Sequence, residues 1–314
     1  MNKLKKIGLT ALAGTLVAGT VNAAEMTVTG SASMALTGLD SSEHTGNGFT
    51  MGDSLTFSAS GDVNDIGITL SYEIDGLGGA TDNVDDHSIT LDFGDAGTLV
   101  FAGHGGSSAL SARDDVMPTA KEEPWDVVTN ADDDIINGQT QEDMFTYTYA
   151  HDSGFTVVAS YINANAGETA VSYFDYAVEY TGVDGLRLGY AAGTTEITAG
   201  TEIEEDTMFA TYAMGGFTVG VQVSDLDDTT ANSDQESIAY GVTYAVNDDL
   251  TIGYNYHELE TESTTDADQE STAIGASFTS GSMTIGGSMN TADNMSGIAA
   301  TDREGYEFSV SFAF

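Results

Sequence analysis

The chain ends on Tyr306-Glu-Phe-Ser-Val-Ser-Phe-Ala-Phe314, which places an apolar side chain at every second position. Successive side chains of a β-strand point to opposite faces, so this segment has one apolar face and one face of small or polar residues. The same period of two appears in Phe217-Thr-Val-Gly-Val-Gln-Val-Ser224 and in Leu250-Thr-Ile-Gly-Tyr-Asn-Tyr256. The pattern predicts an all-β protein in which each strand carries one apolar face.

Segments with this period recur sixteen times along the chain. Their expected positions are 25–38, 52–60, 66–74, 87–93, 97–104, 142–150, 153–162, 171–181, 184–194, 204–214, 216–224, 236–246, 249–259, 270–279, 282–290 and 304–314. Short connections rich in Gly, Asp and Asn, such as 94–97 and 247–249, alternate with longer acidic ones, such as 225–235 and 260–269. The short connections have the composition of hairpin turns, so neighbouring strands are expected to be antiparallel.

Soluble β folds fit this pattern poorly. A β-sandwich keeps apolar residues inside and polar residues outside, whereas the polar face here carries mostly Thr, Ser, Gly and Ala. A β-helix would show a fixed short repeat, and the sequence has none. Strands of about ten residues, an even strand count and alternating connection lengths are typical of a transmembrane barrel. Closure also leaves no unpaired strand edge in lipid. We therefore expect a sixteen-stranded transmembrane antiparallel β-barrel with both termini on the periplasmic side.

The N-terminus has the features of an export signal. Residues 1–23 begin with three lysines, continue with an apolar stretch over 7–18 and end on Val21-Asn22-Ala23. This is the composition of a cleaved signal peptide, and it is favoured over a short buried helix. The apolar stretch is too short to span a bilayer as a helix, and no second one follows. Residues 24–314 are then expected to form one barrel domain.

The charge balance is strongly acidic and excludes some functions. Fifty Asp and Glu face seven Lys and Arg, and after signal cleavage only Arg113, Lys121, Arg187 and Arg303 remain as bases. Nucleic-acid binding needs a basic surface, so it is excluded. The absence of cysteine excludes disulfides and cysteine-based metal sites. A halophilic soluble protein would share the charge, which therefore does not place the chain by itself.

One connection is far longer than the others. Residues 105–141, called here the long loop, separate the fifth and sixth expected strands. A loop of this length is usually functional or disordered. It contains both prolines, Pro118 and Pro124, and the only tryptophan, Trp125. A solvated loop has no need of a bulky aromatic residue, so we expect an ordered loop packed against the barrel.

With a signal peptide, sixteen strands, a terminal Phe314 and a long third outer loop, the chain resembles the general-diffusion porins of Gram-negative bacteria. The resemblance implies an outer-membrane homotrimer in contact with lipid and lipopolysaccharide. It also implies that the third outer loop folds into the lumen and narrows a water-filled pore for ions and small hydrophilic solutes. The final strand resembles those by which outer-membrane proteins reach their assembly machinery. A substrate-specific porin is the alternative, and a structural or adhesin barrel is a less favoured one.

By position, the resemblance assigns the constriction to the long loop. The candidate constriction residues are Arg113, Asp114, Asp115, Lys121, Glu122, Glu123, Trp125 and Asp126. The candidate charged residues of the lumen wall are Glu73, Asp92, Asp175, Glu179 and Arg187. Many such porins oppose an acidic loop with a ladder of arginines, but strands two to five here contain no Lys or Arg. The inward positions expected there are Ser54, Thr56, Ser58, Thr69, Ser71, Glu73, Ser88, Thr90 and Asp92. Because carboxylates in a narrow passage favour cations, the sequence predicts cation preference.

Tyrosines are distributed unevenly. Of the fourteen, only Tyr72 lies in the first five expected strands and only Tyr306 in the last, and the other twelve lie between Tyr147 and Tyr256. Aromatic girdles mark where a barrel meets the lipid interfaces, so strands six to thirteen are expected to face lipid. The remaining wall, with outward Ala32, Ala59 and Gly103, is then free to form the trimer contact.

Catalytic and metal motifs are weak. His44, His87 and His151 are expected in loops or turns, His104 lies near a possible nucleophile, Ser107, and His257 faces inward. None has a recognisable orienting carboxylate, so we expect neither an enzyme nor a cofactor.

One acidic run resembles a calcium loop. Asp132, Asp133 and Asp134, followed by Asn137-Gly138, supply oxygen ligands, but the regular spacing of such loops fails. These acids are weak candidates for loosely bound Ca²⁺, and solvated surface acid is the simpler interpretation.

Overall fold

The computed structural model describes residues 25–39, 48–76, 84–128, 135–136, 143–163, 172–198, 201–229, 233–262 and 267–314. The expected signal peptide, His44 and the candidate calcium ligands Asp132, Asp133 and Asp134 lie outside the described residues.

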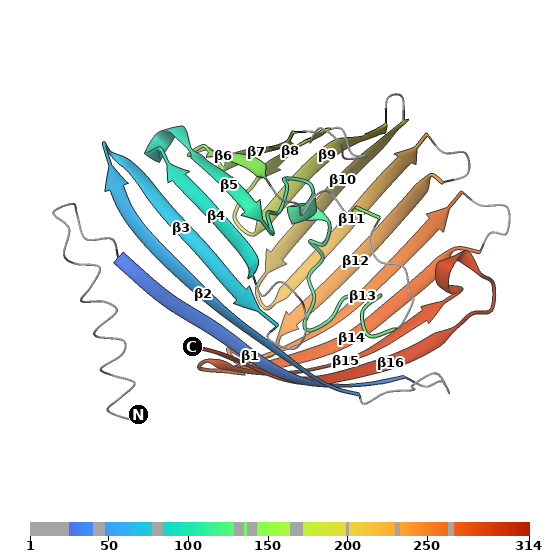
Figure 1. Ribbon diagram of the computed structural model, residues 1–314. Coiled ribbons are helices and arrows are strands. Elements are labelled where there is room, and N and C mark those ends of the chain that lie inside the picture. Colours follow the sequence, from blue (N-terminus) through green and yellow to red (C-terminus); the bar gives the residue numbers. More distant parts are fainter. Residues whose placement is uncertain are drawn as a thin grey trace.

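The apolar-and-polar segments form sixteen strands, as expected. They are β1 (Glu25–Leu39), β2 (Phe49–Val63), β3 (Ile66–Asp75), β4 (Val84–Asp92), β5 (Thr98–His104), β6 (Met144–Ala150), β7 (Phe155–Ile162), β8 (Ser172–Tyr180), β9 (Leu186–Thr198), β10 (Thr201–Met214), β11 (Phe217–Asp228), β12 (Gln235–Ala245), β13 (Leu250–Thr261), β14 (Gln269–Ser280), β15 (Met283–Asp293) and β16 (Arg303–Ala313). Each strand pairs with its neighbours in sequence, and β1 pairs with β16 in antiparallel register. The predicted closed barrel is confirmed (Figure 1).

The polarity of the barrel is inverted relative to a soluble protein. On β11, Phe217 and Val219 are 49% and 46% exposed, whereas Gln222 is 2% exposed. The apolar face of the strands therefore points outward and the polar face inward. Such a continuous apolar outer surface is stable only against lipid or another protein. Within the described residues, no helix is long and apolar enough to cross a membrane.

Several strands extend beyond the expected segments. β9 continues to Thr198, β10 begins at Thr201 and β11 continues to Asp228, so the predicted loop at 225–235 is too long. The reason is that Asp225 and Asp227 occupy outward positions, where the alternating pattern predicts apolar residues. The hydrogen-bonded ladder continues there because pairing, unlike burial in lipid, does not need apolar side chains.

Two further expectations are wrong in detail. His87 lies in β4, with its ring 6.1 Å from that of Tyr72, rather than in a turn. Tyr173 is only 3% exposed and faces inward, so it does not belong to an outer aromatic girdle. Its hydroxyl donates to the Asp175 carboxylate, a polar partner that lipid could not supply.

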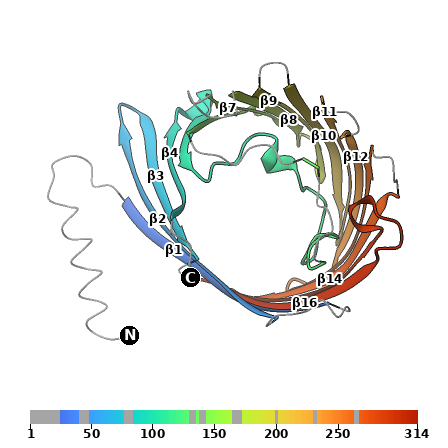
Figure 2. The same cartoon turned by 45° about the vertical axis from the view of Figure 1, so that its right-hand side comes forward.

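The long loop runs inside the ring of strands (Figure 2). Its described part, 105–128 and 135–136, contains one short 3₁₀ turn, η2 (Ser111–Arg113), and no strand that extends the barrel wall. The buried apolar core lies between this loop and the wall. It consists of Ala109, Leu110, Ile135 and Ile136 from the loop and Val158, Ala177, Ala191 and Leu259 from the strands.

Candidate functional site

Asp175 on β8 anchors the beginning of the long loop. Its carboxylate is fully buried and accepts hydrogen bonds from the main-chain N–H groups of Leu110, at 2.6 Å, and Ala109, at 3.3 Å. The Ser160 hydroxyl oxygen on β7 accepts a second bond from Ala109 N–H at 2.8 Å. Hydrogen bonds to a charged acceptor are stronger than neutral ones. Asp175, expected on the water-filled lumen wall, therefore lies beneath the loop and holds it.

A partly buried charge cluster follows the anchor. The Arg113 guanidinium donates to Glu179 on β8, with Nη2 at 2.6 Å from Oε1, and Arg187 Nε donates to Oε2 of the same carboxylate at 2.8 Å. Arg187 also lies over the Phe209 ring, with 4.7 Å between the guanidinium carbon and the ring centroid. The Glu179 carboxylate therefore pairs with both arginines, and their guanidinium groups lie against the barrel wall.

Three inward amides hold the loop backbone. Gln222 on β11 donates to the main-chain carbonyls of Arg113 and Asp114, each at 2.9 Å. Asn255 on β13 donates to the Pro118 carbonyl at 2.8 Å, and Asn290 on β15 donates to the Glu123 carbonyl at 2.5 Å. These three residues are not among those predicted from the sequence. The sequence feature that could have identified them is a bulky amide side chain at an inward position, on strands whose other inward residues are mostly Ser, Thr, Gly and Ala.

A row of inward glycines makes room for the segment 118–121. This glycine track consists of Gly220, Gly241, Gly253, Gly275 and Gly286, one on each strand from β11 to β15. A Cβ on the first two would lie 2.6 and 2.7 Å from atoms of Pro118. On the last two it would lie 3.3 and 2.5 Å from the Lys121 side chain. A Cβ at Gly220 or Gly241 would overlap the loop, and at the other positions it would crowd the loop, so the track permits the loop to lie directly on the wall.

Residues 121–126, called here the acidic turn, form the next part of the loop. Lys121 Nζ pairs with the Glu122 carboxylate and, at 2.9 Å, with Glu307 on β16. The Glu123 carboxyl hydrogen-bonds both Asp115 and Asp126. Burial, the hydrogen bond to Asp126 and the charge of Asp115 raise the pKa of Glu123 from its usual 4.5 to about 9. At neutral pH this carboxyl therefore retains a proton.

Trp125 fixes the acidic turn against β13. Its ring meets the fully buried His257 ring edge-on, with 4.7 Å between centroids and 71° between planes. For the described part of the long loop, this contact agrees with the expectation that the loop packs against the barrel.

The loop divides the inner surface of the barrel in two. It contacts strands from β7 round to β16, whose inner face is called here the covered wall. The inner face of β1–β4 is the open wall, and no described side chain of these strands is buried. Figure 2 shows the described part of the loop running mainly along the side of the ring opposite β1–β3.

Comparison with known proteins agrees with this architecture. The family model described as Gram-negative porin matches residues 8–277. The chain belongs to the Gram-negative porin family. It is therefore a diffusion channel of the outer membrane, a class whose members typically are not enzymes. A search of curated proteins finds no significant match to the sequence.

Solved porins share the fold. OmpT, an outer membrane protein of Vibrio cholerae, superposes with a TM-score of 0.71 at 15% identity over 94% of this chain and 99% of that chain. Salmonella typhi OmpF gives 0.70 at 12% identity, covering 93% of this chain and 98% of that chain. An anion-selective porin from Comamonas acidovorans gives 0.67 at 15% identity, covering 93% and 100%. At these identities the similarity shows the fold alone.

The structure groups only some of the candidate residues in this porin. The structure brings together four carboxyl groups, those of Asp115, Glu122, Glu123 and Asp126. Arg113 is not part of this group, because it pairs with Glu179. On the open wall, Glu73 accepts a hydrogen bond from the Ser54 hydroxyl. Asp92 lies at the end of β4, exposed, where it accepts a bond from Gly94 N–H at 2.8 Å. Asp92, expected on the lumen wall, therefore caps the turn that follows β4.

The histidine and serine singled out for catalysis serve local structure in the porin. His104 Nδ1 lies 2.7 Å from the Asp85 carbonyl oxygen, and the Ser107 hydroxyl lies 2.9 Å from that of Ser111. Both contacts stabilise the junction between β5 and the long loop.

Proposed function

We propose that this porin conducts ions and small hydrophilic solutes between the long loop and the open wall, with a modest preference for cations. The observation that carries the proposal is the pairing of three of the four bases left after signal cleavage. Arg113 and Arg187 share Glu179, and Lys121 pairs with Glu122 and Glu307. No Lys or Arg occurs in the strands of the open wall. Carboxylates are thus left to set the sign of the field in the passage.

The similarity to an anion-selective porin is compatible with this proposal. The Comamonas acidovorans porin has the same fold at 15% identity, so selectivity depends on side chains that the two barrels do not share. The formal net charge of −43 in the present chain favours cations. Salt screens such fields, because the Debye length is about 8 Å at physiological ionic strength. The preference should therefore be larger in dilute salt.

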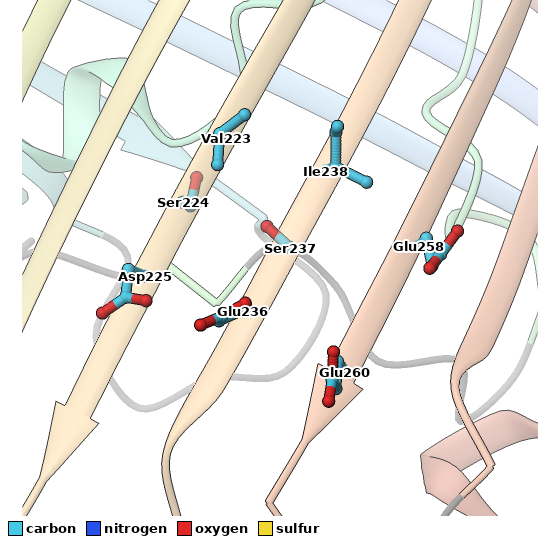
Figure 3. Close-up of a pocket in the computed structure, with 8 residues that line it drawn as sticks. All are labelled: Val223, Ser224, Asp225, Glu236, Ser237, Ile238, Glu258 and Glu260. Atoms are coloured by element: carbon cyan, nitrogen blue, oxygen red, sulfur yellow. The ribbon is translucent and has the colours of Figure 1, made fainter.

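The test is the zero-current potential of the purified porin in a planar bilayer with a potassium chloride gradient. We expect the sign for cations in the wild type and a shift toward anions when Glu122→Gln, Glu123→Gln and Asp126→Asn are combined. The matched control neutralises Asp225, Glu236 and Glu260, which lie at the outer end of β11–β13 around a surface pocket (Figure 3). An anion-selective wild type would contradict the proposal.

Assembly and export follow from the same family membership as proposals. Residues 1–23 would be removed as a signal peptide, and the strand ending at Phe314 would engage the outer-membrane assembly machinery. The wall of β1–β5, with exposed Met34 and Met51 beside the small Ala32 and Ala59, would form a homotrimer in lipid and lipopolysaccharide. A trimer form is known for Vibrio cholerae OmpT. Crosslinking in mild detergent tests this assembly, and monomers alone would contradict it.

A further inference from the structure

Of the three paired bases, Arg187 is the one that the lumen can reach most easily. Its side chain is 37% exposed, whereas that of Lys121 is 21% exposed and that of Arg113 is 10% exposed. Arg113 is also held by the loop itself, because its Nη1 donates to the Ala109 carbonyl at 2.9 Å. Arg187 is the second residue of β9, so it lies near the end of the barrel that carries the short turns. Ions that pass through the lumen can therefore respond to the charge of Arg187.

Two interactions hold the Arg187 side chain at the wall. Its Nε donates to Glu179 Oε2 at 2.8 Å, and its guanidinium carbon lies 4.7 Å from the centroid of the Phe209 ring. Phe209 is 2% exposed and faces inward on β10, although inward residues of the barrel are mostly polar. Its ring lies over Gly189, its partner on β9, where a Cβ would overlap the ring. A guanidinium group stacks favourably on an aromatic face, so the ring is a platform for Arg187.

The Glu179 carboxylate is more enclosed than the guanidinium group that it binds. The Glu179 side chain is 12% exposed, against 37% for Arg187. An ion in the lumen therefore meets the arginine more directly than the carboxylate. Two guanidinium groups and one carboxylate give this cluster a formal charge of +1, and loss of the carboxylate would leave +2. The same loss would remove the hydrogen-bond acceptor that keeps Arg187 on its platform.

We propose that Glu179 is a positioning residue that determines the ion selectivity of this porin through Arg187, by holding the guanidinium group on Phe209 and away from the passage. This inference rests on the proposed conduction through the lumen, and it names the residue that allows a channel with an exposed arginine to prefer cations. Without the carboxylate, only the ring holds Arg187, and the long side chain extends into the water of the lumen. The Debye length is about 30 Å in 0.01 M salt, so the released charge acts on ions throughout the passage.

The test is a double-mutant cycle on the zero-current potential of the full-length porin in dilute potassium chloride. Glu179→Gln should shift the potential toward anions. In an Arg187→Gln background the same change should give a much smaller shift, because the guanidinium group is absent. In an Arg113→Gln background the shift should persist, which separates release of Arg187 from release of the loop.

The matched control is Glu73→Gln, which removes one inward carboxylate from the open wall, where no Lys or Arg occurs in the strands. Its shift should be the same with and without Arg187. A Glu179→Gln shift that is equally independent of Arg187 would mean that the carboxylate acts by its own charge, and would overturn the proposal.

Chemical modification measures the release of Arg187 without a current. Phenylglyoxal reacts with accessible guanidinium groups, and mass spectrometry of the digested porin locates the modified arginines. Arg187 should react faster in Glu179→Gln than in the wild type, while Arg303 on β16, outside the cluster, should react at the same rate in both. Retained β-sheet circular dichroism would show that the variant is folded. An unchanged rate at Arg187 would contradict the role of Glu179.

These experiments separate the inference from the proposed function. An anion-selective wild type would refute the proposed cation preference, whereas the cycle compares shifts and is valid for either sign of the wild-type potential.

Discussion

The covered wall and the open wall have the same alternation of side chains but use their polar residues differently. On the covered wall, Asp175, Gln222 and Asn255 are almost fully buried and bind the main chain of the long loop. On the open wall, equivalent inward positions such as Thr56 and Ser71 remain partly exposed. A polar inward residue of a porin is therefore not by itself a pore-lining residue. What lies over it decides whether it binds water and solute or holds the loop.

The largest effect is expected from breaking the close approach of the loop to the covered wall. Gly241→Leu would place a side chain where Pro118 lies, since even a Cβ would come within 2.7 Å of the Pro118 carbonyl oxygen. Overpacking of this kind costs about 1–3 kcal/mol, so the segment 118–121 should shift toward the open wall. We expect lower single-channel conductance. Gly287→Ala on the outer face of β15, where the nearest atom is 3.4 Å away, is the control and should conduct normally.

An effect of similar size is expected at the anchor of the loop. Asp175→Ala removes the acceptor for Ala109 and Leu110 N–H and for the Tyr173 hydroxyl. Loss of hydrogen bonds to a buried charge costs about 1.5–3 kcal/mol, so the loop should open more often. Limited proteolysis should then cut near Arg113 faster than in the wild type. Asp92→Ala, which removes an exposed turn cap, should leave the cleavage rate unchanged, and equal cleavage in both variants would contradict the assigned anchor.

These two sites show what the sequence could predict. The strands were found because lipid selects an apolar residue at every second position, and the long loop because its length and its prolines interrupt that period. The sequence predicts a loop at 225–228 because the apolar alternation ends there. In the structure β11 continues through these residues, because strand pairing extends past the apolar band. The contacts of Asp175, Gln222 and Asn290 with the long loop could not be predicted. Each residue contacts a segment far away in the sequence, and its neighbours in the sequence give no sign of that contact. For the same reason, the sequence predicts Arg113 at the constriction, whereas in the structure Arg113 pairs with Glu179.

The open wall can be tested by supplying the charge that it lacks. Thr56→Arg combined with Ser71→Arg would place two guanidinium groups beside the passage, opposite the acidic turn. The zero-current potential should shift toward anions, and more so in dilute salt because screening is then weaker. Thr56→Gln with Ser71→Gln adds bulk without charge and should leave the sign unchanged. An unchanged potential in the arginine variant would place the conducting path elsewhere.

The smallest effect is expected from pH. The pKa of Glu123 is raised from 4.5 to about 9, so its proton stabilises the acidic turn fully below pH 4.5, and this stabilisation is lost as pH rises through 9. With chelator present, cation preference should increase above pH 9, because one more negative charge appears in the turn. Glu123→Gln should remove this step. A step that persists in the variant would belong to another group.

The division into a covered and an open wall is tested most directly by the chemical accessibility of single cysteines, since the wild-type chain has none. Ser71→Cys lies on the open wall and Ser271→Cys on the covered wall, where the serine is fully buried. A charged methanethiosulfonate reagent should modify Ser71→Cys rapidly and reduce its current, while Ser271→Cys should remain unmodified and conduct as before. Equal reaction rates at the two positions, or faster reaction at position 271, would contradict the account.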